Sequence, residues 1–124
     1  MSKTTILIVE DDAGLREALL DTLLLGNYNV VAADCAEQAL MMLSSQNVDL
    51  VVSDIQMGEM SGLTLLKSIK SKYPNMPVLL MTAYATIDDA VQAMRDGATD
   101  YLSKPFAPEV LLNLVGRYAP AHKI

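Results

Sequence analysis

Residues 6–12 read Ile6-Leu7-Ile8-Val9-Glu10-Asp11-Asp12, a short aliphatic run that ends in three consecutive acids. Runs of this length, rich in aliphatic and β-branched residues, are typical of strands that are buried on both faces of a parallel sheet. Three later segments repeat the pattern of an apolar run followed by polar residues: residues 50–52 before Ser53-Asp54, residues 78–81 before Thr82, and residues 101–102 before Ser103-Lys104-Pro105. The pattern predicts four strands, each of which ends at polar side chains.

Amphipathic helices are predicted between these strands, together with one further strand over residues 29–33. Apolar residues at helical spacing favour helices over residues 13–25, from Ala36 to Leu43, from an N-cap at Ser61 to Tyr73, from Ile87 to Met94, and from Pro108 onward. We expect Gly26-Asn27 to end the first of these helices with a left-handed residue. Five βα units with short connections predict one α/β domain, a parallel sheet covered by helices on both sides.

The composition limits the class of protein. A chain of 124 residues that is 52% hydrophobic is long enough for one domain with a buried core, either free-standing or cut from a longer protein. We expect neither a signal peptide nor a membrane span, because every apolar run is too short. The single cysteine, Cys35, fits a reducing compartment, which favours the cytoplasm. A net charge of −6 argues against direct binding of nucleic acid.

The polar strand ends are expected to meet, because ligands of open parallel α/β sheets bind just beyond the carboxyl ends of the strands. Glu10, Asp11 and Asp54 would then bring several carboxylates together. Two like charges about 4 Å apart repel by about 4 kcal/mol at an effective dielectric of about 20, so a bound cation would stabilise the cluster. Ligands that are all oxygen atoms favour Mg²⁺. Asp12 is equally well explained as the N-cap of the next helix.

Asp54, Thr82 and Lys104 together suit phosphoryl transfer. A carboxylate can attack phosphorus to form an aspartyl phosphate. A hydroxyl can donate a hydrogen bond to a phosphoryl oxygen, and an ammonium can pair with either the carboxylate or the phosphoryl group. Taken singly, Asp54 is also explained as a loop residue that forms a turn, and Thr82 as a hydroxyl that is satisfied at a strand end. Pro105 restricts Lys104 to an extended backbone.

The pattern formed by Glu10-Asp11, Asp54, Thr82 and Lys104-Pro105-Phe106 resembles the receiver domain of bacterial two-component response regulators, over the whole chain. The resemblance implies a flavodoxin-like fold, a three-layer sandwich of five βα units with strand order 2-1-3-4-5. Residues 82–86 and 98–102 look most like those of receivers attached to enhancer-binding transcription activators.

The resemblance also implies a role for each matching residue. Asp54 would be the phosphoacceptor, Thr82 and Lys104 would hold the phosphoryl group, and Tyr101 would rotate inward on activation. The implied Mg²⁺ ligands are the carboxylates of Asp11 and Asp54, the carboxylate of Glu10 through water, and the backbone carbonyl of Gln56. Gly58 departs from the family pattern, in which proline is usual, and we expect the freer backbone to weaken Mg²⁺ binding.

The function implied by the resemblance is a phosphorylation-controlled switch and not a turnover enzyme, although such a domain can hydrolyse its own aspartyl phosphate. A sensor histidine kinase would supply the phosphoryl group. The surface formed by the fourth helix, the fifth strand and the fifth helix would then control an output domain or a downstream protein, or form a phosphorylation-dependent homodimer. Neither nucleic acid nor a membrane is an expected partner of this domain.

The same residues allow three other interpretations. A phosphatase with an aspartyl nucleophile would need a second catalytic aspartate two residues after Asp54, where this chain has Gln56. A flavin-binding flavodoxin relative would need a hydroxyl-rich phosphate loop after the first strand, where this chain has three acids. A receiver that acts only as an interaction module is disfavoured by the intact set of Asp54, Thr82 and Lys104.

Overall fold

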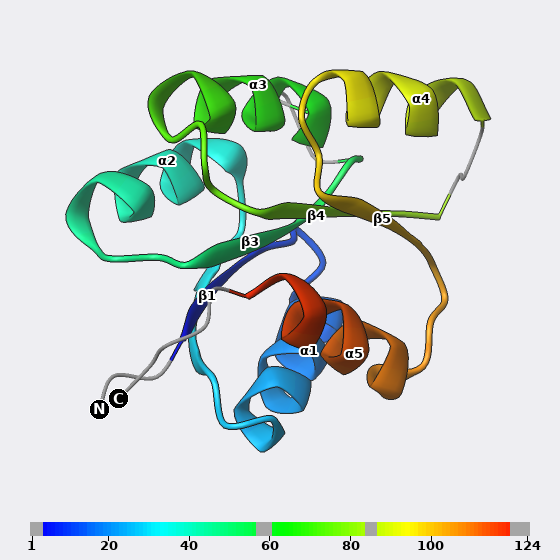
Figure 1. The fold of residues 1–124 in the computed structure, drawn as a ribbon. Helices are drawn as coiled ribbons and strands as arrows, with labels where there is room; N and C mark the ends of the chain where they lie inside the picture. Colours follow the sequence, from blue (N-terminus) through cyan, green and yellow to red (C-terminus); the bar gives the residue numbers. More distant parts are fainter. Residues whose placement is uncertain (1–3, 57–60, 84–86, 120–124) are drawn as a thin grey trace.

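The computed structural model describes residues 4–56, 61–83 and 87–119. Within them five strands alternate with five helices, as drawn in Figure 1. The strands are β1 (Thr5–Val9), β2 (Asn29–Ala33), β3 (Leu50–Asp54), β4 (Val78–Thr82) and β5 (Asp100–Ser103). The helices are α1 (Ala13–Leu25), α2 (Ala36–Ser45), α3 (Gly62–Lys72), α4 (Ile87–Arg95) and α5 (Pro108–Tyr118). The alternation predicted from the apolar runs is confirmed.

All four strand pairs are parallel, and the sheet has the order β2-β1-β3-β4-β5. This is the predicted order. Helices α2, α3 and α4 cover one face of the sheet, and α1 and α5 cover the other (Figure 1). The structure is therefore the expected three-layer α/β sandwich.

The core is divided by the sheet, because successive side chains of a strand point to opposite faces. Leu7 and Val9 of β1 pack in the cluster that contains the buried residues of α2 and α3. Ile6 and Ile8 pack in the cluster that contains the buried residues of α1 and α5. Because both faces of β1 are buried, its aliphatic run is continuous and not alternating.

Local capping explains where several helices begin and end. The Asp12 carboxylate accepts a hydrogen bond of 2.9 Å from the Leu15 N–H, so Asp12 is the N-cap of α1. Ser61 caps α3 in the same way, as predicted. At the end of α1 the left-handed residue is Asn27, with φ 70°, whereas Gly26 has φ −81°. None of the described helices is long and apolar enough to cross a membrane.

Candidate functional site

The carboxyl ends of the central strands meet at one edge of the sheet. The register pairs Val9 with Ser53, Asp54 with Met81, and Thr82 with Ser103. The polar residues that follow or end these strands are therefore brought together: Glu10 and Asp11 after β1, Asp54 in β3, Thr82 in β4, and Lys104 after β5. The meeting of side chains that the sequence predicted is present in the structure.

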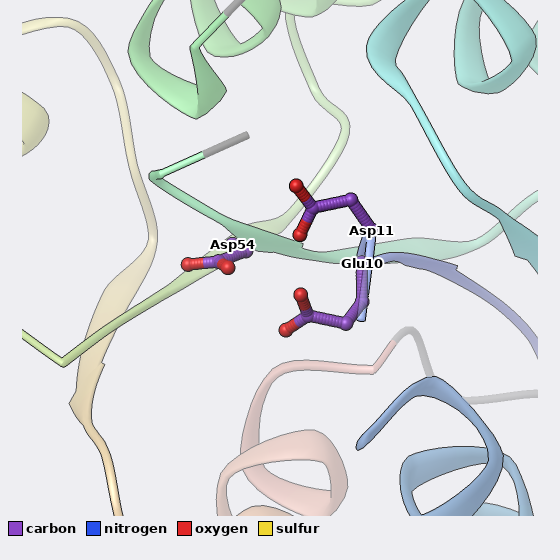
Figure 2. Close-up of side chains that lie close together, drawn as sticks. All are labelled: Glu10, Asp11 and Asp54. Atoms are coloured by element: carbon purple, nitrogen blue, oxygen red, sulfur yellow. The ribbon is translucent and has the colours of Figure 1, made fainter. Parts of the chain in front are cut away.

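Three carboxylates form a compact acidic cluster, which Figure 2 shows at close range. Glu10, Asp11 and Asp54 each offer an oxygen atom, and these atoms all lie within 4.8 Å of one another. Glu10 and Asp54 are buried, whereas Asp11 is exposed to solvent. A set of donors that are all oxygen atoms, open to water on one side, fits a hard cation such as Mg²⁺, which keeps several of its waters.

Lys104 supplies the positive charge of the site. Its Nζ donates a hydrogen bond of 2.8 Å to Glu10 Oε1 and lies 3.1 Å from Asp54 Oδ2. The peptide bond between Lys104 and Pro105 is cis. One ammonium cannot neutralise three carboxylates, so the cluster keeps an excess of negative charge that a divalent cation would offset.

The pKa values of Glu10 and Lys104, the partners of the closest ion pair, are set by different causes. Burial raises the pKa of Glu10 above its ordinary value of 4.5, and this outweighs the hydrogen bonds from Lys104 and from the backbone of Asp12, which lower it. Burial lowers the pKa of Lys104, but its hydrogen bonds and charge interactions with Glu10 and Asp54 outweigh burial and leave that pKa raised above 10.5. Lys104 therefore stays charged at neutral pH, whereas Glu10 is held less firmly in its ionised form.

A pH dependence of stability follows for the metal-free protein. Because the folded-state pKa of Glu10 lies above 4.5, its contribution to stability is fully present below that pH and is lost as the pH rises through the folded-state pKa. Relative to Glu10→Gln, which does not titrate, the wild type should lose unfolding free energy from acid toward neutral pH. Urea unfolding of both proteins in EDTA measures this difference, and equal pH slopes would contradict it.

Gln56 contributes contacts that the sequence did not reveal. Its backbone N–H donates to Asp54 Oδ1 at 3.3 Å, and its side-chain Oε1 accepts from the Thr82 hydroxyl at 2.9 Å. The family resemblance implied a metal-binding role for its backbone carbonyl, but no contact between its side chain and Thr82. A polar side chain two residues beyond Asp54, long enough to reach the neighbouring strand, was the available signal.

Gly62 is a second feature that sequence analysis missed. A Cβ atom at this position would lie 2.2 Å from the backbone carbonyl oxygen of Asp54. The Gly62 N–H also donates to the carbonyl of Ile55 at 2.8 Å. The start of α3 therefore lies directly against the strand end that carries Asp54, and only glycine leaves room for this approach.

Tyr101 lies two strands away from Asp54, since β4 separates β3 from β5 in the sheet. It is in β5, opposite Leu80 of β4, and its partly buried side chain packs against the core cluster on the side of α2 and α3. Its side chain is not part of the acidic cluster of Glu10, Asp11 and Asp54. Gly58 lies outside the described residues.

Comparison with known proteins assigns the family. The family model of the response regulator receiver domain matches residues 6–116. The chain belongs to this family. The receiver domain is a signalling domain and not a metabolic enzyme, and the acidic cluster is compatible with the Mg²⁺ binding that receivers generally require.

The curated relatives of this receiver domain include a response regulator and a transcriptional regulator. The domain is 56% identical over 114 residues to the response regulator protein FleR of Pseudomonas aeruginosa. The matched region covers 92% of this chain and 24% of FleR. It is 40% identical over 117 residues to the DNA-binding transcriptional regulator NtrC of Proteus hauseri. The matched region covers 94% of this chain and 25% of NtrC. The chain thus spans about a quarter of the length of these relatives.

Solved receiver structures share the fold. A CheY-like receiver domain protein of Methanospirillum hungatei has a TM-score of 0.90 and 29% identity, with 94% of this chain and 93% of that chain covered. A response regulator of Burkholderia pseudomallei, solved with a phosphorylated aspartic acid, a calcium ion and citrate, has a TM-score of 0.82 and 31% identity. That match covers 88% of this chain and 64% of the Burkholderia chain.

Proposed function

We propose that this receiver domain accepts a phosphoryl group from a sensor histidine kinase on Asp54, in the presence of Mg²⁺. The observation that carries the proposal is the position of the Asp54 carboxylate, which is buried, belongs to the acidic cluster and lies 3.1 Å from Lys104 Nζ. An acidic cluster alone would indicate only a cation. The ammonium beside the same carboxylate adds a partner for the transferred group.

The metal ligands are part of the proposal. The carboxylates of Asp11 and Asp54, Glu10 through water, and the backbone carbonyl of Gln56 would hold the cation. When bound, Mg²⁺ would neutralise negative charge on the carboxylates and on the phosphoryl oxygens. The Burkholderia structure contains both a phosphorylated aspartic acid and a calcium ion, which supports the proposal of a divalent cation in a phosphorylated receiver.

The proposed transfer is an in-line displacement at phosphorus. A carboxylate oxygen of Asp54 forms the new P–O bond while the P–N bond to the phosphohistidine of the kinase breaks, and the bonding electron pair leaves with the imidazole nitrogen. Lys104, which pairs with Asp54 before transfer, pairs with a phosphoryl oxygen afterwards. Thr82, buried at the end of β4, donates its hydroxyl to another phosphoryl oxygen.

The change at Asp54 is proposed to reach the surface through Thr82 and Tyr101. Thr82 is in β4 and Tyr101 is in the adjacent strand β5. The two strands pair continuously along Leu79 to Thr82 of β4. Movement of Thr82 toward the phosphoryl group would leave space for Tyr101 to turn inward. The outcome is a shift between two arrangements of the surface formed by α4, β5 and α5.

Tyr101→Ala is expected to separate phosphorylation from its consequence. Because Tyr101 does not belong to the acidic cluster, the variant should take up a phosphoryl group as the wild type does. It should fail to change its oligomeric state or partner binding on phosphorylation. Mass spectrometry and analytical ultracentrifugation of the same samples measure both properties, and a normal response of assembly would remove Tyr101 from the switch.

The partners proposed for the whole protein rest on its relatives. NtrC is a DNA-binding transcriptional regulator, so an output domain that controls transcription would be the target of the switch. A phosphorylation-dependent homodimer is the proposed active form, and contact with nucleic acid would belong to the output domain. Slow hydrolysis of the aspartyl phosphate by the domain itself, in the cytoplasm, would reset the switch.

The direct test is phosphorylation by a small donor. The wild type is incubated with acetyl phosphate in Mg²⁺ or in EDTA, and its intact mass is measured. A gain of one phosphoryl group in Mg²⁺ only is the expected result, because acetyl phosphate supplies the same phosphoryl group as the kinase. A folded protein that gains no mass in either solution would contradict the proposal and favour a receiver that acts without phosphorylation.

A further inference from the structure

Gln56 connects the end of β3 to the end of β4 through two different groups. Its backbone N–H donates to Asp54 Oδ1, and its side-chain amide oxygen accepts a hydrogen bond of 2.9 Å from the Thr82 hydroxyl. Thr82 is fully buried, whereas Gln56 is exposed to solvent. An exposed residue after β3 therefore accepts a hydrogen bond from a buried hydroxyl at the end of β4.

The bond to Gln56 competes with the role that the proposed function gives to Thr82. A threonine hydroxyl carries one hydrogen atom, so it can donate to Gln56 or to a phosphoryl oxygen but not fully to both. Thr82 directly follows Met81, the register partner of Asp54. Asp54 and Thr82 therefore lie at the same end of adjacent strands, one register position apart.

We propose that Gln56 is a positioning residue, whose side chain holds the Thr82 hydroxyl in the unmodified protein and opposes its recruitment to the phosphoryl group. This inference rests on the proposed function, because it requires a phosphoryl group on Asp54. The charged phosphoryl oxygen is the stronger acceptor, so the exchange still occurs. Breaking the Gln56 hydrogen bond reduces the free energy gained when the Thr82 hydroxyl moves to the phosphoryl oxygen. The loss is that of one neutral hydrogen bond, which corresponds to about a 2-fold to 10-fold change in the equilibrium constant for this move.

The test is an equilibrium titration with beryllium fluoride in Mg²⁺, in which the beryllium group on a carboxylate oxygen takes the place of a phosphoryl group. Gln56→Met keeps the length and the backbone carbonyl of Gln56 but removes the amide acceptor. It should bind beryllium fluoride about 2-fold to 10-fold more tightly than the wild type. In the Thr82→Val background the same substitution should have no effect, which is the signature of an action through the hydroxyl.

Two further measurements isolate the contact. Gln46→Met is the matched control, since Gln46 is an exposed glutamine at the end of α2, beside the opposite edge of the sheet, and its substitution should leave the affinity unchanged. In the unmodified protein, side-chain couplings and the methyl carbon shift of Thr82, measured by NMR, should change in Gln56→Met and not in Gln46→Met. This readout does not depend on phosphorylation.

The outcomes separate this inference from the proposed function. Equal affinities of the wild type and Gln56→Met, or an effect that persists in Thr82→Val, would overturn the role of Gln56 and leave phosphorylation of Asp54 intact. A wild type that neither binds beryllium fluoride nor gains a phosphoryl group would overturn both. A tighter Gln56→Met together with a changed Thr82 signal supports the inference.

Discussion

Asp54→Asn is expected to abolish the gain of a phosphoryl group from acetyl phosphate. The carboxamide has nearly the shape of the carboxylate but lacks the anionic oxygen that attacks phosphorus. It also removes one charge from a cluster whose oxygens lie within 4.8 Å of one another, so the affinity for the cation should fall as well. Intact mass in Mg²⁺ should show no phosphorylated species, even at donor concentrations that fully modify the wild type.

Asp12→Asn is the matched control for this prediction. It makes the same chemical change in the same acidic run, but the Asp12 side chain caps α1 through Leu15, and asparagine is as good an N-cap as aspartate. This variant should still be phosphorylated. A phosphoryl gain in folded Asp54→Asn would show that another residue is the acceptor, and the mechanism proposed for Asp54 would then be wrong.

Much of this site was predictable because its signals are local in the sequence. The buried strands read as aliphatic runs, and parallel strands place their carboxyl ends at one edge of the sheet, so the meeting of Asp54, Thr82 and Lys104 follows from the fold alone. The caps at Asp12 and Ser61 depend only on the next three residues. What these residues do chemically stays a prediction until phosphorylation is measured.

The features that the sequence did not reveal depend on contacts between elements. Lys104 donates to Glu10 at 2.8 Å and lies 3.1 Å from Asp54, so it bridges both carboxylates, where the sequence suggested only Asp54. The Gln56 contact with Thr82 requires a particular rotamer across two strands. At the end of α1, Gly26 packs closely against α5, since a Cβ on Gly26 would lie 2.8 Å from Leu112 Cδ2. The residue with the left-handed backbone is the next one, Asn27.

Gly62→Ala is expected to destabilise the protein by about 3 kcal/mol or more, because the new methyl group would overlap atoms that cannot move aside. The nearest atoms are the Asp54 carbonyl oxygen at 2.2 Å, Ile55 Cα at 2.8 Å and the Asp54 carbonyl carbon at 2.9 Å, all of them backbone. Relief requires α3 to move away from the end of β3. The displacement would also disturb Asp54, so phosphorylation of the folded fraction should slow.

Gly116→Ala gives the opposite result and so tests the cause. Gly116 lies in α5, where the nearest atom to a new Cβ is the Tyr28 hydroxyl oxygen at 3.8 Å, an ordinary contact. Alanine should therefore stabilise this helix by about 0.5–1 kcal/mol, through its better helix propensity alone. Propensity predicts the same sign for Gly62, the first residue of α3. Urea unfolding that shows opposite signs for the two variants would identify the Asp54 backbone contact as the reason for glycine. Equal stabilisation by both would mean that α3 does not lie so close to the end of β3.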